Sequence, residues 1–393
     1  MKELSRIASA VQASTTMVID AMFKQMKADG VDVIGFGAGE PDFNTPDNIK
    51  AAGIAAIEQN ITRYTPAAGT VELRQAVCGR MKADYGLEYK PSQVVVSSGA
   101  KHLVYLALRA VVNPGDEVIL PAPYWVSYIE LIKMVGGVPV VVTATEAEHF
   151  KLTAEKLSAA ITPRTKAILL NNPSNPTGMM YDREELEAIA AVCTQADIYV
   201  ISDEIYACLA YDGRTFTSFA SLSADAKERT ILVNGVSKAY AMTGWRIGYA
   251  CANDVIAKVM ANYVSHSTGS PVAISQRAAA VALSGSQAEI ETMRQAFEQR
   301  RNYIVERMNA IPGVQVSVEP AEKCGVRGLH VTVLAHGVEE HSHDVPCGGA
   351  GQAHVHEHEH PHDHEHDHEH HHEHDENCTC GCHDHEHHHH HHA

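Results

Sequence analysis

Residues 1 to about 330 alternate short apolar runs with longer stretches of helical periodicity, and this alternation limits the possible folds most strongly. The runs are bounded by Gly, Pro, Asn or Ser. They lie at 94–98, 116–121, 138–143, 166–172, 198–203, 230–235 and 246–252. Strands alternating with helices predict an α/β fold with a mostly parallel sheet covered on both faces. In such sheets, ligands bind at the carboxyl ends of the strands.

The last part of the chain, from Glu339, breaks this pattern. It holds fourteen acidic residues, no Lys or Arg, and a near-strict alternation of His with acidic residues. The net charge of −17 therefore comes mostly from this tail, and the residues before it carry only −3. A nearly neutral body offers no basic face for nucleic acid. A tail with so few apolar residues cannot form a core, so it is expected to be disordered.

The remaining composition, with 45% hydrophobic residues, is typical of a soluble globular protein. No apolar run approaches the ~20 residues that span a bilayer, and residues 1–14 lack the apolar core of a signal peptide. Five of the nine cysteines occur singly, as in a reducing compartment. These features predict a cytoplasmic protein without a membrane partner.

Three predicted strand ends carry residues suited to chemistry. Segment 97–103 begins a helix, whose free N–H groups suit a phosphate, although a plain strand-to-helix turn explains it too. Asp203 follows a buried strand, so it either caps a helix or faces a cation. Lys238 follows an apolar strand with no acidic residue nearby in sequence, a setting in which a lysine can act as a nucleophile. Ser237 and Arg246 can hold an anion, but a surface lysine with a structural arginine is the simpler alternative.

A phosphate site, a carboxylate, a phenol and a nucleophilic lysine together suit pyridoxal 5′-phosphate. The chain resembles the class I aminotransferases of the fold type I pyridoxal-phosphate superfamily, in the bacterial aspartate aminotransferase branch. The resemblance covers residues 1 to about 320. It implies a mostly parallel seven-stranded sheet in a large domain beside a smaller domain. The matching motifs are VIGFGAGEPDF (33–43), RYTPAAG (63–69), SSGAKH (97–102), PYW (123–125), NNPSNPTG (171–178), SDEIY (202–206) and SKAYAMTGWRIGY (237–249).

The resemblance implies cofactor roles for the matching residues. Lys238 would bond covalently to the cofactor and transfer a proton at the substrate α-carbon, and Asp203 would pair with the ring nitrogen. Tyr206 and Asn175 would contact the ring oxygen, and Trp125 would stack on the ring. Asn175 and Trp125 would also contact the substrate. The residues that would hold the phosphate are Gly99, Ala100, Ser237 and Arg246.

The same resemblance implies a homodimer, in which Tyr64 reaches the phosphate of the neighbouring subunit. The backbone of Gly39 would contact the substrate α-carboxylate, and Lys101, Ser14 and Thr16 would help to bind a distal carboxylate. This favours aspartate or glutamate as donor and a 2-oxo acid as acceptor. An N-cap and a solvated helix face explain Ser14 and Thr16 equally well. A lyase or decarboxylase on the same fold is an alternative, since it would use the same cofactor residues.

The resemblance also divides the chain. Residues 1–44 would belong to the small domain, 45–275 to the large cofactor-binding domain, 276–338 to an atypical remainder of the small domain, and 339–393 to the tail. The family's later Arg motif, which grips the α-carboxylate, is not matched, and Arg327 is the last basic residue. Losing such a partner costs about 2–5 kcal/mol of binding. We therefore expect cofactor binding with weakened transamination.

The tail resembles the metal-binding tails of histidine-rich nickel-handling proteins. Imidazoles and thiolates suit Ni or Zn, and carboxylates attract divalent cations. The expected ligands are His354, His356, His358, His360, His362, His364, His366, His368, His370, Cys378, Cys380 and Cys382. A purification tag at 387–392, a frameshift or a fusion would equally explain this segment. A further alternative is a metal-storage protein that uses the body only as a scaffold.

Overall fold

The structure is a computed structural model that describes residues 2–35, 37, 39–312, 314–323, 326–335 and 338–339. Of residues 15–17, 308–309 and those from 314 onward, only the backbone is described. Contacts between Cα atoms separate the chain into the units Met1–His341 and Ser342–Ala393, and every described residue lies in the first.

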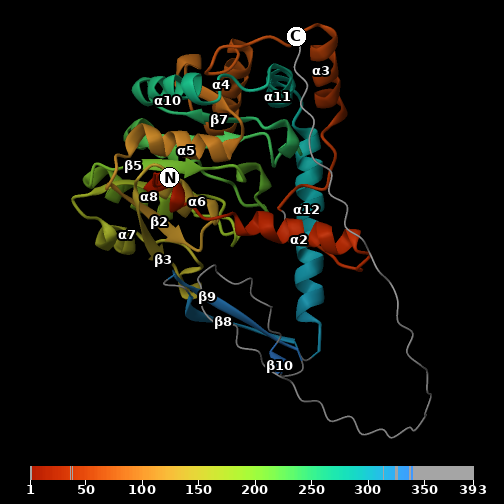
Figure 1. The fold of residues 1–393 in the computed structure, drawn as a ribbon, viewed down its shortest axis with the longest axis vertical. Helices are drawn as coiled ribbons and strands as arrows, with labels where there is room; N and C mark the ends of the chain where they lie inside the picture. The colour runs from red at the N-terminus through yellow and green to blue at the C-terminus, as the bar shows by residue number, and fades with distance from the viewer. Residues whose placement is uncertain are drawn as a thin grey trace, which may run out of the picture. The chain divides into compact units, whose positions relative to one another are not determined.

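A seven-stranded sheet forms the centre of this unit (Figure 1). Its strands are β1 (Val94–Ser97), β2 (Glu117–Ala122), β3 (Val138–Thr143), β4 (Thr165–Asn171), β5 (Tyr199–Asp203), β6 (Thr230–Gly235) and β7 (Gly248–Cys251). Their order is β1-β7-β6-β5-β4-β2-β3. Only β7 is antiparallel to its neighbours. The predicted mostly parallel sheet is therefore confirmed.

One predicted strand, 246–252, begins late. Arg246 has a φ of 55°, a left-handed conformation that a strand residue does not adopt, so β7 starts only at Gly248. The same residue ends a short 3-10 helix, η5 (Thr243–Trp245). This turn directs the Arg246 side chain to the sheet edge instead of into the sheet.

Helices cover both faces of the sheet. The helices of the described structure are α1 (Arg6–Ser9), α2 (Thr15–Ala28), α3 (Asp47–Glu58), α4 (Val71–Tyr85), α5 (Ala100–Val111), α6 (Ser127–Met134), α7 (Ala154–Ala160), α8 (Arg183–Gln195), α9 (Ala224–Arg229), α10 (Asp254–Ser267), α11 (Ala273–Ser284) and α12 (Ala288–Asn309). A second, antiparallel sheet follows α12. It contains β8 (Val314–Lys323), β9 (Val326–Ala335) and β10 (Val338–Glu339).

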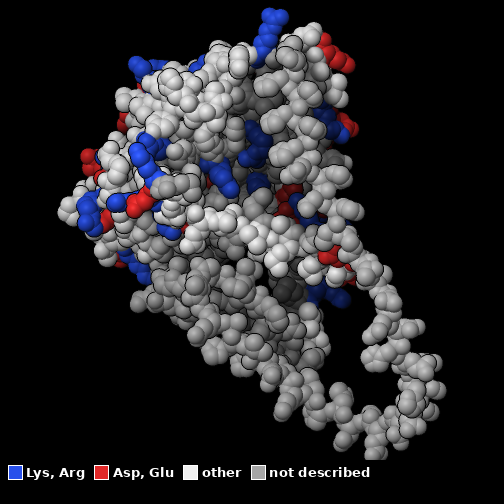
Figure 2. Space-filling view, in the orientation of Figure 1, with Lys and Arg blue, Asp and Glu red and all other residues white. Residues whose placement is uncertain are grey.

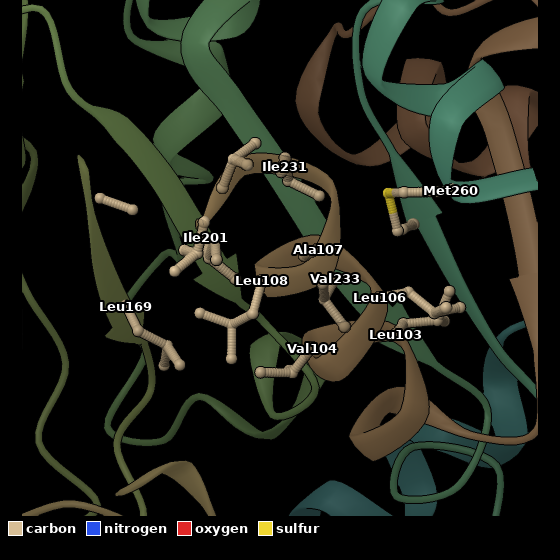
Figure 3. Packing of buried hydrophobic residues seen from close by; sticks show 14 of the residues in the cluster. Leu103, Val104, Leu106, Ala107, Leu108, Leu169, Ile201, Ile231, Val233 and Met260 are labelled. Atoms are coloured by element: carbon tan, nitrogen blue, oxygen red, sulfur yellow. The ribbon is translucent and has the colours of Figure 1, made fainter. Parts of the chain in front are cut away.

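The core forms because successive strand residues point to opposite faces. On one face, Leu169 of β4, Ile201 of β5 and Val233 of β6 pack with Val104 and Leu108 of α5 (Figure 3). Helices α6 and α10 complete this layer. On the other face, neighbouring strand residues pack against α7 and α8 or against α4 and α11. Each fully buried leucine or isoleucine contributes about 1.5–3 kcal/mol, so the sheet is a rigid support for its loops.

The surface visible in Figure 2 shows basic and acidic side chains interspersed. Many of them pair along single helices, as Arg80 does with Asp84 at 2.6 Å and Arg183 with Glu187 at 2.8 Å. Such exposed pairs contribute little individually. Within the described residues, no helix is both long and apolar enough to cross a membrane.

Candidate active site

Strand register brings the predicted site residues to one edge of the sheet. Ser97 and Gly235 both pair with Gly248, which places the ends of β1 and β6 beside the start of β7. Asp203 pairs with Val233 on one side and with Asn171 on the other. The loops that follow these ends carry Gly99, Asn175, Tyr206 and Lys238. Since parallel strands end at the same edge, residues far apart in sequence meet there.

Asp203 is the buried acid of this edge, with 3% of its surface exposed. One carboxylate oxygen accepts a hydrogen bond from the Tyr128 hydroxyl at 2.8 Å, and the other from the Ile205 amide at 3.2 Å. Burial raises the pKa of Asp203 to about 6, although both hydrogen bonds oppose the rise. Asp203 caps no helix and forms no ion pair within the described part of the chain.

Tyr128 was not predicted from the sequence. It lies on α6, is buried, and packs edge-to-face against Trp125 with 5.2 Å between ring centroids. Its hydroxyl is the only side-chain donor to Asp203 among the described residues. The one available signal was its position three residues after Trp125, which places both rings on the same face of a helical turn.

Asn175 and Tyr206 lie at the same edge and are linked by a hydrogen bond. The Asn175 side-chain amide donates to the Tyr206 hydroxyl at 3.4 Å, and its backbone amide donates to the Asn171 side chain at 2.7 Å. Asn171 in turn donates to the Asp203 carbonyl at 2.9 Å. Burial and the Asp203 carboxylate raise the pKa of Tyr206. The phenol therefore stays protonated and can donate a hydrogen bond.

Lys238 lies half-buried just beyond β6 and donates a hydrogen bond to the Gly39 carbonyl. Its ammonium lies 6.0 Å from the centroid of the Tyr206 ring. Burial lowers the pKa of Lys238, and Arg246 adds to this effect, while Glu40 opposes it. The sequence placed no acid near Lys238, but the fold brings Glu40 across from the N-terminal segment. A lowered pKa increases the fraction of neutral, nucleophilic amine.

The segment at Gly99 forms an anion site. Helix α5 begins at Ala100, so its free N–H groups and positive dipole end face the edge. The Arg246 guanidinium lies over Gly99 and donates to the Ser98 carbonyl at 3.2 Å. Ser237 lies buried beside Lys238 in the loop after β6. The expected phosphate contacts thus come from two loops that meet beside β7.

These residues fit the cofactor that the resemblance implies. An anionic group fits the start of α5 because a side chain at Gly99 would fill that space, with its Cβ 2.7 Å from a guanidinium nitrogen of Arg246. A protonated ring nitrogen fits Asp203, whose buried charge has no cationic partner among the described residues. An amine that bonds to an aldehyde fits Lys238.

Replacing Gly99 with alanine should weaken cofactor affinity by about 10–100-fold, because the new Cβ would displace Arg246 from a charged contact worth about 1.5–3 kcal/mol. Gly115→Ala is the matched control, since Gly115 has the same φ of 91° but no atom within 4 Å of the position that a methyl group would take. Absorbance titration with pyridoxal phosphate measures both. Equal losses in the two variants would contradict the anion-site assignment, since they would reflect backbone strain alone.

Four further residues were predicted to bind the substrate or the phosphate of a neighbouring subunit. The Lys101 ammonium lies 4.8 Å from the Trp125 ring centroid, and burial followed by the positive charge of Arg246 lowers the pKa of Lys101. Ser14 occupies the N-cap position of α2. The side chain of Thr16 lies outside the described structure. The Tyr64 side chain is fully exposed to solvent.

The predicted metal ligands from His354 to Cys382 lie outside the described residues, as does the side chain of Arg327. Within the described part of the chain, no group of three or more His, Cys, Asp or Glu side chains could hold a metal ion.

Three comparisons with known proteins all find aminotransferases. The family model for aminotransferase class I and II matches residues 31–324. The chain is 50% identical to an aspartate aminotransferase of Bacillus sp. (strain YM-2), over 80% of this chain and 81% of that protein. It is 45% identical to an aspartate aminotransferase of Bacillus subtilis (strain 168), over 89% and 92%. The structure of Thermus thermophilus aspartate aminotransferase with maleate superimposes with a TM-score of 0.77 at 42% identity, over 80% and 82%.

Proposed function

Since the chain belongs to the class I and II aminotransferase family, we propose that it moves the amino group of aspartate or glutamate to a 2-oxo acid. The observation that carries this proposal is the meeting of Lys238, the buried Asp203 and the Asn175–Tyr206 pair at one sheet edge. The two Bacillus relatives, named aspartate aminotransferases at 50% and 45% identity, support the choice of an acidic donor.

Pyridoxal 5′-phosphate, the cofactor of this family, supplies an electron-poor ring that stabilises negative charge at the substrate α-carbon. Asp203 would pair with the ring nitrogen, and Tyr128 and the Ile205 amide hold its carboxylate in place for this. Asn175 and Tyr206 offer donors to the ring oxygen.

Lys238 acts on the proton of the substrate α-carbon through its Nζ atom. A general base of this kind contributes about 10²–10⁴-fold to the rate. Its lowered pKa favours the neutral amine that accepts the proton. The Gly39 carbonyl accepts a hydrogen bond from Nζ and so orients the amine toward this edge in the cofactor-free protein.

Substrate choice rests on Lys101 in this proposal. Its ammonium lies over the ring of Trp125, the residue expected to stack on the cofactor, and it could bind a second carboxylate of the substrate. Replacing Lys101 with alanine should raise the KM for aspartate by roughly 10–100-fold, the effect of losing a charged hydrogen bond. The KM for alanine should stay unchanged. Lys166→Ala, which removes a lysine stacked on Tyr199 away from the edge, is the control.

The experiment that tests the function as a whole is a substrate screen on the purified chain. The protein should absorb as a pyridoxal-phosphate protein, and aspartate or glutamate should change that spectrum and release the matching 2-oxo acid. A spectrum that aspartate leaves unchanged, while a decarboxylated or eliminated product forms from another amino acid, would replace this function with a lyase or decarboxylase. A low rate with bound cofactor would fit the unmatched Arg motif.

We also propose a homodimer. Tyr64 exposes 102% of its reference surface, and Ile54 and Ile57 on α3 expose 58% and 56%. Exposed apolar side chains of this size favour a protein partner, and the phenol of Tyr64 would then reach the partner's phosphate. Sedimentation analysis should give twice the chain mass, and Tyr64→Phe should weaken cofactor binding. A monomer, or a Tyr64→Phe variant that binds the cofactor as tightly as wild type, would contradict this role.

For the tail we propose labile binding of Ni or Zn, supported by its alternating imidazoles and acids and its three nearby thiols. Equilibrium dialysis should show several bound ions per full chain and none on a chain that ends near residue 338. Equal binding by both chains would contradict the proposal.

A further inference from the structure

A second buried carboxyl lies directly after Asp203. Glu204 is 0% exposed, and one of its carboxylate oxygens accepts three hydrogen bonds. The donors are the Ser202 hydroxyl at 2.9 Å, the Ser218 hydroxyl at 3.0 Å and the Phe219 amide at 3.1 Å. The side chain of Glu204 thus connects the end of β5 to the short 3-10 helix η4 (Phe219–Ser221).

The two neighbouring acids face different surroundings. Asp203 bonds to Tyr128 in the layer of α5 and α6. Glu204 bonds to Ser218 and Phe219, and Phe219 belongs to the core on the opposite face of the sheet. The two carboxyls therefore share no hydrogen-bond partner, and Glu204 affects the site by holding the end of β5 and by its charge beside Asp203.

The second oxygen of Glu204 is buried and has no hydrogen-bond partner among the described residues. The titratable groups whose pKa values respond to Glu204 are Tyr85, Tyr89 and Cys251, and none of them is a cation. The Tyr89 hydroxyl is likewise buried and unpartnered within the described structure. An ionised Glu204 would add a second, uncompensated negative charge beside Asp203.

Two basic side chains act on groups around Glu204, and both are already engaged. Lys227, whose charge acts on Cys251, lies 4.7 Å from the Tyr89 ring centroid and donates a hydrogen bond to the Glu88 carbonyl. Arg80 of α4 donates to both oxygens of Asp84, at 2.8 Å and 2.6 Å. Burial, and secondarily the charge of Asp203, raise the pKa of Glu204 to about 7 despite the three hydrogen bonds. Of the two acids, only Asp203 gains a cationic partner when a protonated ring binds. Glu204 is the one suited to keep its proton.

We propose that Glu204 is a positioning residue that works as an uncharged acid: it fixes the end of β5, where Asp203 and Tyr206 face the cofactor, without placing a second negative charge beside Asp203. This inference rests on the proposed function for its cofactor readout alone. A glutamine has the same shape, and its carbonyl can accept the same three hydrogen bonds. Glutamine should therefore replace Glu204, and alanine should not.

The first test compares the cofactor affinities of the wild-type chain, Glu204→Gln and Glu204→Ala by absorbance titration at pH 6.5. Glu204→Gln should bind within about threefold of wild type, whereas Glu204→Ala should bind about tenfold more weakly or worse, because three donors lose their acceptor. Glu184→Gln, at an exposed position on α8, is the control. Equal impairment of the glutamine and alanine variants would overturn the uncharged role. Wild-type affinity in Glu204→Ala would overturn the positioning role.

The second test measures urea unfolding of the full chain from pH 5 to pH 8.5. Folding raises the pKa of the Glu204 carboxyl from its value in the unfolded chain to about 7. The folded protein therefore loses stability as the pH rises between these two pKa values. The wild type should therefore lose more stability over this range than Glu204→Gln. Identical pH dependence in the two would overturn the proposal. This readout needs no cofactor, so it still tests Glu204 if the wild-type chain fails to bind pyridoxal phosphate.

If Glu204→Ala does not fold, Ser218→Ala provides the same comparison with a smaller change. It removes one of the three donors and leaves the carboxyl in place. Its cofactor affinity should fall by about two- to tenfold, as expected for one lost hydrogen bond. Unchanged affinity would overturn the positioning role.

Discussion

Lys238→Ala should lower kcat by about 10³-fold or more, because the variant loses both the amine that bonds to the cofactor and the base that moves the α-carbon proton. Lys238 is the one lysine that lies beside both Tyr206 and the Gly39 carbonyl in the described structure. Steady-state assays with aspartate and 2-oxoglutarate measure the loss. Borohydride should fix the cofactor to the wild-type chain and not to the variant.

Two controls make this result specific. Lys238→Arg keeps the positive charge but cannot replace the amine, so it should be nearly as inactive. Lys258→Ala removes an exposed lysine of α10 and should leave kcat unchanged. If Lys238→Ala kept more than about a tenth of the wild-type kcat, Lys238 could not be the base at the α-carbon.

The second large effect concerns Asp203, whose replacement should weaken cofactor binding but stabilise the cofactor-free protein. Asp203→Asn should weaken cofactor affinity by about two to three orders of magnitude, since removing one partner of a buried charge pair costs about 3–5 kcal/mol. The same substitution should stabilise the cofactor-free protein by about 3 kcal/mol near pH 8. Burial raises the pKa of Asp203 from 3.8 to about 6, so its charge opposes folding there.

The raised pKa of Asp203 also determines how the stability difference between wild type and Asp203→Asn depends on pH. Below about pH 4 the carboxyl is protonated in the folded and unfolded states, so wild type and Asp203→Asn should be equally stable. The advantage of the variant should grow between pH 4 and pH 6 and stay constant above it. Urea midpoints of the cofactor-free proteins across this range measure it. A variant that is less stable than wild type at pH 8 would show that Asp203 is paired without the cofactor.

The sequence predicted the central sheet well, because its strands depend on local patterns. Apolar runs bounded by turn residues identified the seven strands of the central sheet but not β8–β10, and parallel strands must bring their ends together. Motif spacing therefore located Lys238 and Asp203 at the same edge. The late start of β7 was missed because the left-handed backbone of Arg246 has no local signal, Arg246 being neither Gly nor Asn.

Contacts between distant segments could not be predicted in the same way. Tyr128, Glu40 and Ser218 act on the site through tertiary packing. Glu40 lies in the 33–43 motif and Tyr128 lies three residues after Trp125, but neither pattern says which group each would contact. Glu204 is the clearest case. It directly follows Asp203 in the sequence, but its hydrogen bonds lead to the opposite face of the sheet.

The connection from Gly235 to Gly248 carries Lys238 at one end and Arg246 at the other. The covalent anchor and the phosphate contact therefore lie on one uninterrupted hairpin between two paired strands. In protein engineering, this loop could be exchanged among relatives as one unit. Its flanking strands would keep both functional groups in register. An insertion of even one residue inside it would misplace two functions at once, so natural variation in length should be found elsewhere in the chain.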